Sequence, residues 1–213
     1  LRSYNRLMTE YGVKDYRVIA TTALREAENQ HYIVDQIRIR TGFELEVVDM
    51  LQEIFFKYAA LYHMIRKHRI ERSDEALLFV DISSGGLGFT LLKNGVIHYQ
   101  QNIHIGAVRI KESFDKNERD SIHFHQALSE YIYSSIESVK SGLSQHSIKY
   151  IVTSGNENHL LLQMLGRGAA DGLTCVSRRE FQSLYENVQG LNLPQLMKTY
   201  RLSENKAEMA LPT

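Results

Sequence analysis

The chain has 213 residues, of which 43% are hydrophobic and 23% charged, as expected for a globular protein with a sizeable core. Basic and acidic residues both number 25, so the formal net charge is zero, which argues against a general nucleic-acid binder or a polybasic membrane binder. The single cysteine excludes an intramolecular disulfide framework, and without a recognisable signal peptide or bilayer-spanning apolar run we expect a cytoplasmic protein.

The first third of the chain alternates segments with helical and strand-like patterns. Apolar residues at helical spacing predict helices, and short β-prone runs between them predict strands. Thr21 and Thr22 offer a helix N-cap, and Gly42 is placed to end the helix that follows. The expected elements are helix 1–11, strand 16–20, helix 23–40, strand 43–48 and helix 50–69.

The most charged stretch of the chain, KHRIERSDE at 67–75, follows these elements. We interpret it as a solvated connection and predict two domains, at residues 1–72 and 73–213. A frayed helix end followed by a loop is the alternative interpretation of the same residues.

The remaining residues again mix strands and helices. Asn94-Gly95 between two β-prone runs is a strong signal for a hairpin. Interleaved strands and helices predict an α/β fold with mixed sheets flanked by helices. The expected strands are 76–81, 88–92, 96–104 and 148–152, and the expected helices are 106–114, 122–142, a helix ending near 165, and short helices over 177–211.

The turn after the buried-type strand 76–81 is the most informative local feature. Asp81 ends this strand and is followed by the small residues Ser83, Ser84, Gly85 and Gly86. Small residues let a backbone approach an anion, and consecutive amides in such a turn can point at it. A carboxylate beside them can hold a divalent cation. A plain Gly/Ser-rich turn between two strands explains the same residues without any ligand.

Several segments resemble, in order and spacing, motifs of the exopolyphosphatase and guanosine pentaphosphate phosphohydrolase (Ppx/GppA) family. Residues 18–29, VIATTALREAEN, are similar to the family segment AT-x-ALR-x-A-x-N, and residues 102–114, NIHIGAVRIKESF, are similar to LPLGAVRLTERF. Weaker similarities lie at 45–53 (LEVVDMLQE), 81–86 (DISSGG), 151–155 (IVTSG) and 202–212 (LSENKAEMALP).

The resemblance implies an actin-like (ribonuclease H-like) fold of two α/β domains with a phosphate-binding cleft. It also implies removal of terminal phosphates from inorganic polyphosphate or guanosine pentaphosphate with Mg²⁺. Its motifs assign catalysis to Glu53, which orients or deprotonates water, and the metal to Asp81. They assign phosphate binding to Arg25, Ser83, Ser84, Gly85, Gly86, Ser154 and Gly155.

Each of the three charged site residues also has a simpler interpretation. Arg25 could be a surface residue paired with Glu26 or Glu28, Glu53 could lie on the solvated face of its helix, and Asp81 could cap a turn. Cys175 is expected to be a buried small hydrophobic residue rather than a nucleophile.

The chain departs from the family pattern at several positions. Gly88 stands where the family has a carboxylate, Met50 replaces a glycine, and the family's first phosphate loop has no counterpart in these 213 residues. These differences leave a second hypothesis open, a catalytically degenerate regulatory protein that binds polyphosphate or a nucleotide. A third is an actin-like scaffold, and an apolar helix face would suit a homodimer.

Overall fold

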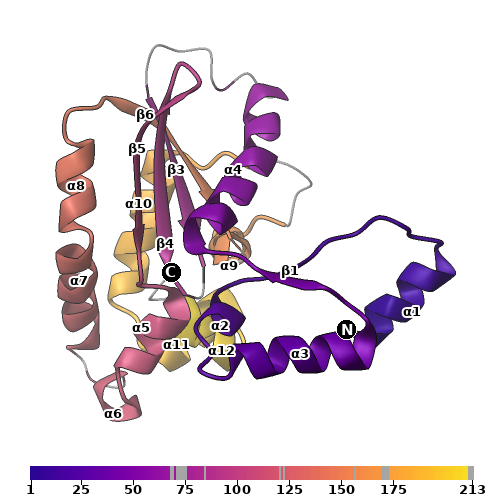
Figure 1. The fold of residues 1–213 in the computed structure, drawn as a ribbon. Helices are drawn as coiled ribbons and strands as arrows, with labels where there is room; N and C mark the ends of the chain where they lie inside the picture. Colours follow the sequence, from indigo (N-terminus) through magenta and orange to yellow (C-terminus); the bar gives the residue numbers. More distant parts are fainter. Residues whose placement is uncertain are drawn as a thin grey trace. The chain divides into compact units, whose positions relative to one another are not determined.

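The computed structural model describes residues 1–67, 70, 76–83, 85–119, 121, 123–155, 157–168 and 173–210 (Figure 1). They fall into two compact units, Leu1–Ala59 (unit 1) and Ala60–Thr213 (unit 2). Most of the charged stretch 67–75, where we expected the domain boundary, lies outside the described residues. The boundary between residues 72 and 73 therefore stays a prediction.

Unit 1 is built on a short parallel pair of strands, β1 and β2, with Val18 opposite Leu45 and Ala20 opposite Val47. Each strand leads into a helix, so α2 and the first part of α4 both begin at the carboxyl edge of this pair. The elements of this part of the chain are α1 (Arg2–Glu10), β1 (Val18–Ala20), α2 (Thr22–Arg25), α3 (Gln30–Thr41), β2 (Leu45–Val47) and α4 (Met50–Lys67), the last of which crosses into unit 2.

The helix expected over 23–40 is wrong as a single element. It is divided into α2 and α3, separated by residues 26–29, although that segment contains neither glycine nor proline. The expected stop at Gly42 is confirmed, because this residue caps α3 in the left-handed conformation with φ 74°. The helix expected over 1–11 forms as α1, but the apolar residues Tyr4 and Leu7, and the C-cap residue Tyr11, are exposed.

Unit 2 contains a mixed sheet with the order β5-β4-β3-β6 among the described residues. Its strands are β3 (Ala76–Ile82), β4 (Leu87–Lys93), β5 (Val96–Ile103) and β6 (Ile148–Ser154). The inner strand β3 is antiparallel to β4 and parallel to β6, and its continuous apolar run is largely buried on both faces. The carboxyl ends of β3 and β6 therefore meet at one edge of the sheet, where Asp81 lies opposite Ser154.

The hairpin predicted between β4 and β5 is confirmed. Asn94 and Gly95 have φ values of 53° and 74°, and strand pairing continues up to Lys93 and Val96 on either side of them. Positive φ at both central residues is what a two-residue hairpin turn requires.

Helices between β5 and β6 supply one side of the unit 2 core. They are α5 (Ala107–Ser113), α6 (Lys116–Arg119), α7 (Phe124–Ser135) and α8 (Glu137–Leu143). Figure 1 shows α8 alongside the sheet, where its buried Val139 packs with Leu78 and Leu91. The helix expected over 122–142 is interrupted at Ile136, which is both the C-cap of α7 and the N-cap of α8, so that α8 can pack on the sheet while α7 packs on α5 through Phe124.

The last third forms the predicted short helices. They are α9 (Glu157–Met164), α10 (Arg178–Gln189), α11 (Leu193–Tyr200) and α12 (Glu204–Ala210), and their shared core includes Leu160, Leu184 and Leu196. The expectation that Cys175 is buried is wrong: it is exposed, because it lies on the irregular segment before α10. Within the described part of the chain, every helix is too short or too polar to cross a bilayer.

Candidate functional site

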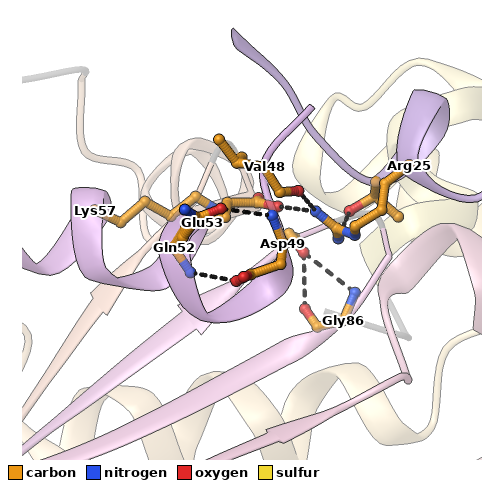
Figure 2. A network of polar contacts seen from close by, with 9 residues as sticks. Arg25, Val48, Asp49, Gln52, Glu53, Lys57 and Gly86 are labelled. Atoms are coloured by element: carbon orange, nitrogen blue, oxygen red, sulfur yellow. Dashed lines mark hydrogen bonds and ion pairs between the residues drawn. The ribbon is translucent and has the colours of Figure 1, made fainter. Parts of the chain in front are cut away.

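Arg25 occupies the end of α2 and turns its guanidinium toward the start of α4 (Figure 2). Its Nη1 donates to the carbonyl oxygen of Val48 at 3.0 Å and to Oε2 of Glu53 at 3.2 Å, and its Nη2 donates to Thr22 Oγ1 at 3.0 Å. The side chain of Arg25 is 18% exposed. These contacts fix the direction of the guanidinium, and the low exposure shows that Arg25 is not the surface residue of the simpler interpretation.

Glu53 is placed by the way α4 begins. Asp49 and Gln52 form a reciprocal cap, in which the Gln52 amide donates to Asp49 Oδ1 at 2.7 Å and the Asp49 amide donates to Gln52 Oε1 at 3.0 Å. The next residue is Glu53, which is held in the first turn and is only 13% exposed. It is therefore not a solvated residue on a polar helix face.

Both oxygens of the Glu53 carboxylate accept hydrogen bonds from cations. Arg25 donates to Oε2 as described, and Lys57 Nζ donates to Oε1 at 2.9 Å from the next turn of α4 (Figure 2). Such charge-assisted bonds are stronger than neutral ones, and the low exposure of Glu53 reduces their screening by water and salt. Unit 1 thus places two basic groups around one carboxyl group.

Asp81 lies near the carboxyl end of β3 in unit 2 and is 3% exposed. Its Oδ1 accepts a hydrogen bond of 2.5 Å from Ser154 Oγ at the end of β6. The sheet register brings these two residues together although they are 73 positions apart in the sequence. The structure therefore joins two of the predicted site residues in unit 2, just as it joins Arg25 and Glu53 in unit 1.

The turn after β3 is closed by Ser83. Its backbone amide and its hydroxyl both donate to the carbonyl oxygen of Gly86, at 3.0 and 2.9 Å, and its Oγ accepts from the Gly86 amide at 3.1 Å. The Gly86 amide is thus engaged inside the turn rather than directed at an anion. Gly85 is buried beside it, and Ser84 lies outside the described residues.

Two glycines of the predicted phosphate loops have packing reasons to be glycine. A Cβ on Gly86 would lie 2.8 Å from the carbonyl oxygen of Ile103, and a Cβ on Gly155 would lie 2.0 Å from that of Ile82. Gly155 also has φ 129°, which side-chain-bearing residues rarely adopt. Close approach of neighbouring backbone explains both glycines without a ligand.

The side chains around Asp81 determine which ligands the protein could offer to a cation at this position. Asp81 is a hard oxygen ligand of the kind that Mg²⁺ prefers, and its neighbours in register are Ser154 on β6 and Gly88 on β4. Gly88 brings no side chain to the position where the family pattern has a carboxylate. Among the residues that the structure describes, no group of three or more His, Cys, Asp or Glu side chains could hold a metal ion. These donors therefore suit a cation that also binds substrate phosphates and water, not one enclosed by protein ligands.

Lys57 is the residue of this arrangement that sequence reasoning missed. Its position four residues after Glu53 is the usual spacing for a helical ion pair, so the signal was available. The cap formed by Asp49 and Gln52 was also missed, although Asp followed three residues later by Gln at the start of an apolar helix indicates it.

Comparison with known proteins adds a family and a fold to this geometry. A family model described as the Ppx/GppA phosphatase family matches residues 1–213. A curated relative, the bifunctional 3-dehydroquinate synthase/phosphatase of Fusobacterium nucleatum, is 25% identical over 121 residues, which are 56% of this chain. The chain spans only 18% of the length of that relative.

Two of the similar solved structures cover almost the whole chain. The Ppx/GppA family member from Aquifex aeolicus has a TM-score of 0.76 at 18% identity, over 99% of this chain and 67% of its own. An exopolyphosphatase from Cytophaga hutchinsonii has a TM-score of 0.73 at 17% identity, over 99% of this chain and 68% of its own. These likenesses confirm the expected actin-like α/β fold.

Proposed function

Because the chain belongs to the Ppx/GppA phosphatase family, we propose that it hydrolyses the terminal phosphoanhydride bond of inorganic polyphosphate or of guanosine pentaphosphate. One observation carries the proposal: the two residues that the family motifs assign to phosphate binding and catalysis, Arg25 and Glu53, lie 3.2 Å apart although 28 positions separate them. The names of the Cytophaga hutchinsonii and Fusobacterium nucleatum relatives, an exopolyphosphatase and a bifunctional synthase/phosphatase, are consistent with a phosphatase.

In this proposal Arg25 binds the phosphate that is transferred. A guanidinium presents several donors in one plane, which suits two oxygens of a phosphate better than a single-point ammonium does. Its contact with the Val48 carbonyl restrains the side chain before substrate arrives, so less freedom is lost on binding. Ser83, Ser84, Gly85, Gly86, Ser154 and Gly155 are proposed to bind the remaining phosphates, and for Gly86 this requires its amide to exchange Ser83 Oγ for the anion.

Glu53 acts on the attacking water. The carboxylate orients the water and accepts one of its protons while the water oxygen bonds to the terminal phosphorus. The bond from that phosphorus to the bridging oxygen breaks, so the products are inorganic phosphate and a chain or nucleotide shortened by one phosphate. The partial burial of Glu53 keeps this carboxylate in a fixed direction.

Asp81 would hold Mg²⁺, with substrate phosphates and water completing the ligands. The bound ion would neutralise charge on the departing phosphate. Ser154 orients Asp81 through its hydrogen bond, and the low exposure of Asp81 keeps this pair in place.

The experiment measures phosphate release by the natural full-length protein, with Mg²⁺, from long-chain polyphosphate and from guanosine pentaphosphate. The proposal is supported if the wild type releases phosphate from either substrate and Glu53→Gln lowers the rate of this release by about 100-fold or more. The matched control is Glu46→Gln, which breaks the exposed pair of Arg17 and Glu46 in the same unit and should keep wild-type turnover. Equal turnover of wild type and Glu53→Gln would remove Glu53 from the mechanism.

A second candidate function is a regulatory protein that binds the same ligands without turnover. The observation that favours it is Gly88, which lies opposite Asp81 in the sheet and has no carboxylate to share in metal or water binding. A rise in melting temperature with polyphosphate or guanosine pentaphosphate, without phosphate release, would support this function over hydrolysis.

We further propose that the protein is cytoplasmic and forms a homodimer. The exposed apolar residues Tyr4 and Leu7 of α1, with Tyr11 just after it, are consistent with a contact surface. Light scattering after size exclusion tests the dimer, and a monomer at micromolar concentration would contradict it.

A further inference from the structure

We propose that Lys57 is a positioning residue, which holds the Glu53 carboxylate in its reactive direction when Arg25 turns to a substrate phosphate. The inference rests on the proposed function and adds to it a residue that the family motifs do not assign. It starts from the hydrogen bond between Lys57 Nζ and Glu53 Oε1, which is 2.9 Å long and joins successive turns of α4.

The geometry divides the two carboxylate oxygens between two cations. Arg25 reaches Oε2 and Lys57 reaches Oε1 from the other side of the carboxylate, as Figure 2 shows. Arg25 Nη1 also donates to the Val48 carbonyl, so the guanidinium is shared between a backbone acceptor and Glu53. A phosphate that arrives at Arg25 competes with Glu53 for the same donors, because phosphate and carboxylate oxygens both accept hydrogen bonds from guanidinium N–H groups.

Lys57 supplies the hydrogen bond that Glu53 keeps when a phosphate takes its donor from Arg25. When Arg25 donates to phosphate, Glu53 loses one charged donor and retains the other, so its direction is preserved. The ammonium also keeps the sum of the three charges at plus one, since Arg25 and Glu53 alone cancel. An anionic substrate approaching a carboxylate is repelled less when that carboxylate is already paired.

Burial separates this pair, whose residues are four positions apart, from an ordinary surface pair of Glu and Lys three positions apart on another helix. The carboxylate of Glu53 is 13% exposed and Lys57 is 34% exposed. In contrast, Lys140 and Glu137 of α8 form a comparable pair at 3.0 Å in which both side chains are largely exposed. Lys140→Met is therefore the matched control for Lys57→Met.

The experiment compares kcat and KM of wild type, Lys57→Met, Lys57→Arg and Lys140→Met in the natural full-length protein, with polyphosphate and guanosine pentaphosphate and Mg²⁺. We expect Lys57→Met to lower kcat about tenfold or more while KM stays within about threefold, since orientation of the attacking group is lost and substrate binding is kept. Lys57→Arg should recover most of kcat, and Lys140→Met should resemble wild type. Urea unfolding of each variant identifies any loss of kcat that follows from unfolding.

Each other outcome overturns the inference in a recognisable way. Wild-type kcat in Lys57→Met removes Lys57 alone and leaves the proposed hydrolase intact. A raised KM with unchanged kcat shows that Lys57 binds substrate directly and does not position Glu53. A folded wild-type protein that releases no phosphate from either substrate overturns the proposed function and this inference together.

Discussion

Ser154 Oγ donates a hydrogen bond of 2.5 Å to Oδ1 of Asp81, which joins the ends of the neighbouring parallel strands β6 and β3. Asp81 is among the most buried charged residues of unit 2 that the structure describes. A carboxylate in such a place needs donors, because burial of a charge without hydrogen bonds is costly.

Ser154→Ala should destabilise the protein by about 1–3 kcal/mol, because it removes a donor from the buried carboxylate of Asp81. Urea unfolding measures the change. Ser135→Ala is the control, because the Ser135 hydroxyl donates to the Tyr131 carbonyl of α7 in a hydrogen bond that is exposed to solvent, and it should change stability by no more than about 0.5 kcal/mol. Equal stability of the two variants would contradict the role given to Ser154.

Gly155→Ala should destabilise the protein by at least about 2 kcal/mol, since both the backbone angle and the 2.0 Å approach to the Ile82 carbonyl oxygen exclude a Cβ. Gly190→Ala is the matched control, because Gly190 has φ −91° and a Cβ there meets nothing within 4 Å. Melting temperatures of the two variants test this difference. A Gly155→Ala protein as stable as wild type would show that the two backbone segments separate easily.

Arg25→Lys should lower kcat/KM about 10- to 100-fold, because a lysine keeps the charge but cannot contact the Val48 carbonyl and two phosphate oxygens with one planar group. Steady-state kinetics with the better of the two substrates checks this. Arg17→Lys should leave kcat/KM near wild type, since Arg17 pairs with Glu46 at the exposed surface. A fully active Arg25→Lys protein would show that charge alone suffices.

Part of the stability of α10 should depend on the ionised Glu180 carboxylate and should be lost in acid. Hydrogen bonds from the side chain and amide of Ser177, with the nearby charge of Arg167, hold the pKa of the Glu180 carboxyl below its ordinary value of 4.5. The folded pKa is lower than the unfolded one, so this contribution is complete above pH 4.5 and is lost as the pH falls through the folded value.

Glu180→Gln should therefore reduce the loss of stability between neutral and acidic pH, because glutamine keeps a capping group but does not ionise. Urea midpoints measured at a series of pH values test this. Glu186→Gln, on the same helix, is the control and should retain the wild-type dependence. Parallel curves for Glu180→Gln and wild type would contradict the expected linkage.

The sequence predicted the strands better than the helix boundaries. Strands such as 76–81 are continuous apolar runs between clear turn residues, and the Asn94-Gly95 hairpin has a direct stereochemical cause. The breaks between α2 and α3 and at Ile136 were not predicted, because neither has a glycine or proline and the apolar spacing continues through both. Tertiary packing decides such breaks, and local preference does not encode it.

The candidate site likewise has features that the local sequence predicts and features that only the tertiary structure reveals. Periodicity alone could not bring Arg25 to Glu53 or Ser154 to Asp81, because each contact joins segments that only the strand order places together. The family motifs named these residues, and the structure supplied their partners. Lys57 could have been found from its spacing to Glu53, whereas the use of Ser83 to close its own turn could not, since a hydroxyl in a turn has many acceptors within reach.

The parallel alignment of Val18 with Leu45 has a consequence for how this protein can diverge. Arg25 follows β1 and Glu53 follows β2, each at a fixed number of residues from the end of its strand. A shift of one residue in the pairing of β1 with β2 would therefore move Arg25 by about 3.3 Å relative to Glu53. An insertion before either strand preserves the contact between Arg25 and Glu53. An insertion between β1 and Arg25, or between β2 and Glu53, breaks this contact. The tolerance of unit 1 to changes of length is therefore set by two short intervals of the chain, 21–24 and 48–52.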